Sequence, residues 1–141
     1  MRKLRILSIL TVLMMVMAIP AFAAGRSLSA DLSPSNEVPP TASNASGTVD
    51  VLLNPAKGEV CVHLKSGGFE GAVIAGHIHE GPVGVNGPVV VNLEVNSATF
   101  ENCVAADADL IKDIGRNPSD YYVNIHTTAF PGGEIRGQLS K

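Results

Sequence analysis

The fold is indicated most clearly by residues 47–65, which read GTVDVLLNPAKGEVCVHLK. Apolar and polar side chains alternate on both sides of the turn at 54–58, as in two half-buried strands joined by a hairpin. On the second strand one face is wholly aliphatic, and the other carries Cys61 and His63. The stretch therefore predicts an antiparallel sheet with one face packed on a core.

Short segments of the same kind recur at roughly ten-residue spacing between Gly/Pro turns, which favours a sandwich or barrel. We predict a mainly β, antiparallel Greek-key sandwich or barrel, immunoglobulin-like, with one short helix over 105–114 that ends at Gly115. The further strands are expected at 27–32, 72–79, 88–93, 99–104, 121–127 and 133–139.

The alternation also predicts which side chains face the core. Ile74, Gly76 and Ile78 should share one face of 72–79, opposite the face of His77 and His79. On 133–139 the polar residues Glu134, Arg136 and Gln138 should face outward.

The N-terminus has the layout of a secretory signal peptide. Basic residues precede an apolar run over 6–19, and Ala21-Phe22-Ala23 forms an A-x-A cleavage site. A retained anchor is the alternative, but the run is shorter than the ~20 residues that span a bilayer. We expect a signal peptide at 1–23, an N-terminal strand and Pro/Ser/Asn-rich loop at 24–46, and the remainder of one domain at 47–141, exported to the periplasm or secreted.

The charge of the exported part excludes two classes of partner. Cleavage removes Arg2, Lys3 and Arg5, whereas all 13 acidic residues lie downstream. An acidic domain without a basic cluster binds nucleic acid poorly, and it has little attraction to an anionic membrane surface. We therefore expect neither nucleic acid nor, after cleavage, a membrane as partner.

Two cysteines, Cys61 and Cys103, both lie in the exported part. Because that compartment permits oxidation, we expect them to form a disulfide bond. A metal-ligand or redox pair is the alternative, although no C-x-x-C spacing supports it.

The histidines are the sharpest chemical signal. His77 and His79 are two apart on one predicted strand, so both side chains share a face and could converge on one ion. If the strand that carries His126 is a neighbour, three imidazoles would form a site suited to copper or zinc. Solvated or hydrogen-bonded histidines remain the alternative. His63 stands alone on another strand and is read as a surface residue.

No catalytic residues are identified. No serine lies in a G-x-S-x-G elbow, and no cysteine is free if the disulfide forms. The glycines at 81, 84 and 87 lead into Pro88 and not into a helix, which favours loop geometry over a phosphate site.

Several motifs together resemble the CHRD domain, which is named from its occurrence in chordin and is common in exported bacterial proteins. They are NEVPP (36–40), GT (47–48), GHIHEG (76–81), YVNIHT (122–127) and FPGGEIRGQL (130–139). The resemblance implies a β-sandwich or barrel but no settled activity, and its place in chordin implies protein binding.

A weaker resemblance is to copper/zinc superoxide dismutase, on the order of His77, His79, His126 and Arg136 along the chain. It implies a similar fold, with the histidines as copper ligands and the arginine guiding an anion. No histidine-rich zinc loop follows Gly81, so the resemblance supports a shared fold more than a shared reaction. A copper-only dismutase-like enzyme is therefore the least favoured hypothesis.

Two other hypotheses remain. In the first, an exported domain binds copper or zinc through the three histidines, while Glu80, Tyr122 and Asn124 orient the imidazoles. Arg136 could join them, or pair with an acid such as Glu134. In the second, the domain is a structural or protein-interaction module without metal, whose partner is an extracellular or envelope protein.

Overall fold

The computed structural model describes residues 25–141, and the expected signal peptide lies outside this range. The element order is β1 (Arg26–Leu32), η1 (Pro34–Asn36), β2 (Ser46–Asn54), β3 (Glu59–Gly67), β4 (Val73–Glu80), β5 (Val89–Asn92), β6 (Thr99–Ala105), α1 (Ala108–Arg116), η2 (Pro118–Asp120), β7 (Tyr121–Thr127) and β8 (Ile135–Gln138).

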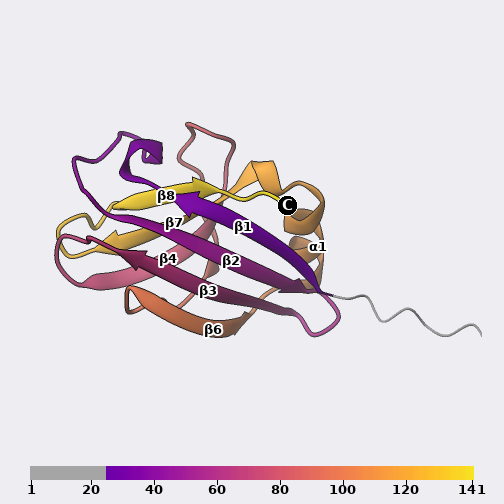
Figure 1. Ribbon diagram of the computed structural model, residues 1–141. Coiled ribbons are helices and arrows are strands. Elements are labelled where there is room, and N and C mark those ends of the chain that lie inside the picture. The colour runs from indigo at the N-terminus through magenta and orange to yellow at the C-terminus, as the bar shows by residue number, and fades with distance from the viewer. Residues whose placement is uncertain (1–24) are drawn as a thin grey trace, which may run out of the picture.

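The strands form two four-stranded antiparallel sheets that stack as a sandwich (Figure 1). The first sheet has the order β1-β2-β3-β6, and the second has the order β5-β4-β7-β8. The mainly β sandwich with one α-helix is thus confirmed. Of the two predicted forms, the barrel is not found, because the described strands belong to two separate sheets.

The core lies between the sheets and is built from aliphatic side chains, as the period of two predicts. In the first sheet the predicted inward residues Val60, Val62 and Leu64 are all buried. The second sheet contributes Ile78, Val91, Val123, Ile125 and Ile135. The opposite, non-core face of the second sheet is the one that carries His77, His79 and His126.

Helix α1 packs at one end of the sandwich against β2 and β3 (Figure 1). The Asp107 carboxylate caps its first turn by accepting hydrogen bonds from the N–H groups of residues 109 and 110. The prediction that Gly115 ends the helix is wrong, because α1 continues to Arg116. Gly115 is buried within α1, with the side chains of Arg26 and Leu53 beside it. Within 25–141, no helix has the length and apolar character needed to cross a membrane.

The burial of three side chains differs from what the alternation suggests. Ile74 is 50% exposed and is not part of the core, because the pairing of β4 with β7 is irregular between Val73 and Ala75. Glu134 and Arg136 are 0% and 5% exposed and do not face solvent. Gln138, on the same strand, is only partly exposed.

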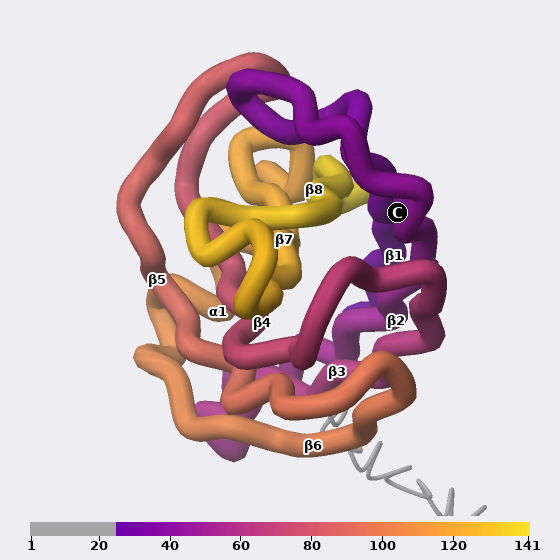
Figure 2. The backbone as a smooth tube through the Cα atoms, turned by 90° about the vertical axis from the view of Figure 1, so that its left-hand side faces the viewer, coloured from indigo at the N-terminus to yellow at the C-terminus, as the bar shows by residue number. Residues whose placement is uncertain are grey.

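The burial of Glu134 and Arg136 follows from two segments that cover the non-core face of the second sheet. One is the connection between β1 and β2, and the other is the β4–β5 loop; the two lie side by side at one end of the molecule (Figure 2). The connection supplies Thr41 and Ser43, whose hydroxyls donate hydrogen bonds to the Glu134 carbonyl and carboxylate. Buried charges are tolerated when they are paired or hydrogen-bonded in this way.

Candidate metal centre

Two paired strands bring the three predicted histidines together. His77 and His79 lie on β4 and share its non-core face, and His126 lies on β7, which pairs antiparallel with β4. The register places His126 opposite Ala75, so its ring is diagonal to that of His77. The condition set by the sequence, that the two strands be neighbours, is therefore met.

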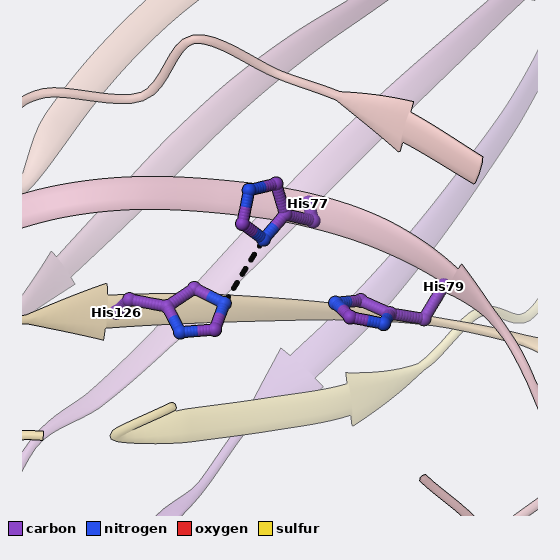
Figure 3. Close-up of side chains that lie close together, drawn as sticks. All are labelled: His77, His79 and His126. Atoms are coloured by element: carbon purple, nitrogen blue, oxygen red, sulfur yellow. Dashed lines mark hydrogen bonds between the residues drawn. The ribbon is translucent and has the colours of Figure 1, made fainter. Parts of the chain in front are cut away.

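The imidazole nitrogens converge (Figure 3). His77 Nδ1 lies 3.0 Å from His126 Nε2, and one nitrogen from each of the three rings lies within 4.8 Å of the others. Metal–nitrogen bonds to zinc measure ~2.0–2.1 Å, so two nitrogens 3.0 Å apart can both reach one ion. Among the described residues this is the single group of three or more His, Cys, Asp or Glu side chains with such proximity.

The hydrogen bonds of the Nδ1 atoms of His79 and His126 determine which of their nitrogens are available as metal ligands. His79 Nδ1 lies 2.8 Å from the Gly87 carbonyl oxygen, and His126 Nδ1 lies 2.9 Å from the Pro131 carbonyl oxygen. Because a carbonyl can only accept, both Nδ1 atoms carry the proton and both Nε2 atoms carry a lone pair in the neutral rings. This is the arrangement by which backbone carbonyls orient metal-binding histidines.

Among residues 25–141, the buried Nε2 atom of His79 has no hydrogen-bond partner. A buried acceptor without a partner is costly, and most such atoms in folded proteins are paired. The atom faces the other two imidazoles (Figure 3), so a cation among the rings would satisfy it.

The electrostatics keep the rings in the neutral form that binds metals. Burial, together with the neighbouring His126 and His79 rings, lowers the pKa of His77 to about 4. Burial also lowers the pKa of His126, against the opposing effect of its hydrogen bond to Pro131. At neutral pH both imidazoles are therefore uncharged, so each has a nitrogen lone pair for a metal ion without first losing a proton.

The Tyr122 ring packs against the His79 ring, and Arg136 in turn packs against Tyr122. The rings of Tyr122 and His79 stack with centroids 4.8 Å apart and planes 7° from parallel. The guanidinium carbon of Arg136 lies 4.0 Å from the centroid of the Tyr122 ring. The Tyr122 hydroxyl also accepts a hydrogen bond from the N–H of Gly87, whose carbonyl accepts the one from His79.

The sequence suggested Glu134 as an acid with which Arg136 could pair. In the structure Arg136 pairs with Glu37. The Arg136 Nη2 and Nε atoms lie 2.9 and 3.1 Å from Glu37 Oε2, and the two side chains are 6% and 3% exposed. Arg136 also donates to the Val85 carbonyl and to the Asn86 side chain in the β4–β5 loop. Burial raises the pKa of Glu37, and the charge of Arg136 opposes that shift.

The other two residues expected near the imidazoles differ in position. Asn124 is buried, and its Oδ1 atom lies 3.0 Å from His126 Nε2. Glu80 is exposed, and its carboxylate has no ion pair or hydrogen bond with an imidazole in the described part of the chain. His63 lies on the first sheet, partly exposed and 4.0 Å from Asp50, away from the three-histidine cluster.

The disulfide between Cys61 and Cys103 is confirmed and joins β3 to β6, where the two residues are directly opposite. It lies on the outer face of the first sheet and contributes no ligand to the cluster.

Sequence reasoning missed Glu37, Gly87 and Pro131. All three lie in loops, where no periodicity predicts orientation, and two of them act through backbone carbonyls that any residue type supplies. The partner of Arg136 had to be one of the acidic residues, but no spacing in the sequence singles out Glu37, which is 99 residues away.

Comparison with known proteins gives one match. The family model described as CHRD domain matches residues 28–139. No curated protein and no solved structure matches the chain.

Proposed function

We propose that this chain, which belongs to the CHRD domain family, is an exported β domain that binds a copper or zinc ion through His77, His79 and His126. The observation that carries the proposal is the buried, unpartnered Nε2 atom of His79, which faces two further imidazoles. Three neutral imidazoles form a donor set suited to either metal.

Export is supported by the disulfide, since such bonds persist in oxidising compartments. The signal-peptide pattern in residues 1–23 supports the same conclusion. Periplasmic and fully secreted locations both fit these observations.

The surroundings of the cluster favour binding over redox catalysis. His79 and His126 are each 9% exposed, and backbone carbonyls hold both rings in place. Arg136 is neutralised by Glu37, so it is not a free cation that could attract an anion to the ion.

Metal analysis tests the proposal. The chain without residues 1–23 is purified without chelating resin, analysed for metal content and titrated with Cu²⁺ and Zn²⁺. We expect about one tightly bound ion per chain, which is lost when His77, His79 and His126 are all replaced by alanine. The matched control is His63→Ala, which removes an imidazole from the other sheet and should leave binding unchanged.

Absence of stoichiometric metal, or equal loss in the His63→Ala control, would contradict the proposal. The domain would then be a structural or protein-interaction module, with an extracellular or envelope protein as its partner.

A further inference from the structure

Asn124 lies beside the three-histidine cluster. It is 2% exposed, it lies on β7 two residues before His126, and the register places it opposite His77 on β4. Its Oδ1 atom is 3.0 Å from His126 Nε2, one of the three converging nitrogens. The amide is therefore among the imidazoles and not outside them.

The contact between Asn124 and His126 joins two acceptors. The Nδ1 proton of His126 is directed at the Pro131 carbonyl, so its Nε2 presents only a lone pair in the neutral ring. An amide oxygen also presents only lone pairs. Two acceptors at 3.0 Å repel each other unless a positive charge lies beside both.

The other end of the amide lies on the side of Glu37 and Gly133. Asn124 Nδ2 and Glu37 Oε1 flank the same point beside Gly133, at 3.0 and 2.6 Å from where a Cβ would be. Within residues 25–141, Glu37 Oε1 is buried and has no hydrogen-bond partner, so no hydrogen bond joins it to Asn124 Nδ2. The negative charge of the carboxylate nevertheless favours the N–H end of the amide on its own side, which leaves the oxygen on the side of His126.

We infer that Asn124 Oδ1 is a fourth protein ligand, so that the site binds a divalent ion through three imidazole nitrogens and one amide oxygen. The inference rests on the proposed function and extends it. Four protein ligands are typical of structural zinc sites, whereas catalytic sites keep one position for water or substrate. The ion is therefore held by the domain and not offered to a substrate.

The test uses Co²⁺, whose visible absorption reports the number and geometry of its ligands, together with Zn²⁺ titration. Asn124→Leu removes the oxygen at similar volume. We expect Zn²⁺ affinity to fall by about 10–100-fold, the range typical of altered contacts around a metal. The Co²⁺ spectrum of the parent should not respond to added azide, whereas the variant should respond, because azide takes the vacated position.

Asn92→Leu is the matched control. Asn92 flanks His77 on the other side, on β5, but its Oδ1 accepts from the Glu94 N–H and not from the cluster. Its replacement should leave both affinity and azide response as in the parent. If Asn124→Leu fails to fold by circular dichroism, Asn124→Asp keeps the shape and should still alter the Co²⁺ spectrum by adding a charged ligand.

The outcomes separate the two proposals. Failure of the parent to bind either metal contradicts the proposed function itself. Normal binding by the parent, with an unchanged affinity and azide response in Asn124→Leu or an unchanged spectrum in Asn124→Asp, overturns the fourth ligand and leaves the three-histidine site standing.

Discussion

The ring of Tyr122 lies nearly parallel to the ring of His79, with 4.8 Å between centroids and 7° between planes. The contact joins neighbouring strands, because the two residues are direct partners in the register of β4 and β7. Together with the hydrogen bond from Nδ1 to Gly87, the stack fixes the plane of an imidazole whose Nε2 faces the other two.

Tyr122 is therefore expected to control metal affinity without touching the ion. Tyr122→Leu removes the stack and should weaken Cu²⁺ or Zn²⁺ binding by about 10–100-fold. Tyr122→Phe keeps the ring and loses only the hydroxyl that accepts from Gly87, so it should bind nearly as the parent does. Titration calorimetry of both variants provides the comparison. Equal affinities for Leu and Phe would show that the stack has no role.

The buried ion pair of Glu37 and Arg136 should contribute strongly when one partner alone is removed. Arg136→Leu leaves a carboxylate buried without its cation, and we expect a loss of about 3–5 kcal/mol in the free energy of unfolding. The double variant with Glu37→Leu should recover part of that loss. Denaturant unfolding measures both values, and a double variant no more stable than the single one would contradict this account.

An exposed ion pair on α1 provides the control for that experiment. Lys112 and Asp109 are 2.8 Å apart, but their side chains are 51% and 87% exposed. Lys112→Leu should therefore leave the free energy of unfolding nearly unchanged.

Reduction of the disulfide should lower the melting temperature. The bond joins residues 42 apart, and the chain-entropy argument assigns such a loop about 4 kcal/mol. For a domain of this size we expect a fall of roughly 10–20 °C. Calorimetry with and without reductant tests this, and a Cys61→Ser/Cys103→Ser variant should melt with the reduced protein. An unchanged melting temperature would show that the bond contributes nothing to stability.

The metal-free protein should lose stability as the pH falls from about 6.5 to about 4. The unfolded chain protonates His77 near the ordinary pKa of 6.5, whereas the folded chain resists protonation until about 4. Since the unfolded state binds more protons in that window, stability rises with pH across it. His126, whose pKa is also lowered, acts in the same direction.

A variant with His77→Gln and His126→Gln tests the pH dependence. Burial is the main cause of both pKa shifts, and glutamine does not titrate, so the variant should show a flatter curve. Denaturant unfolding in chelator at several pH values gives both curves. Parallel curves for parent and variant would exclude the imidazoles as the cause.

The local pattern of the sequence was enough for most of the strands. The alternation around Val60 and Val62 places both in the core, and β7 begins and ends at the predicted residues, Tyr121 and Thr127. Prediction failed where a feature depended on other parts of the chain. The helix continues one residue past Gly115, and Ile74 lies at an irregularity in strand pairing that its neighbours in sequence do not reveal.

What the sequence by itself determined is that His77 and His79 share one face of a strand, because a side-chain period of two is a local property of extended backbone. Only the tertiary structure decided that His126 joins them, since that required β7 to pair with β4 at one particular register. It also decided that Arg136 is buried against Glu37, because the segments that cover this face come from distant parts of the chain. Alternation determines which side chains point away from the core. Whether those side chains are exposed to water depends on which other segments of the chain cover them.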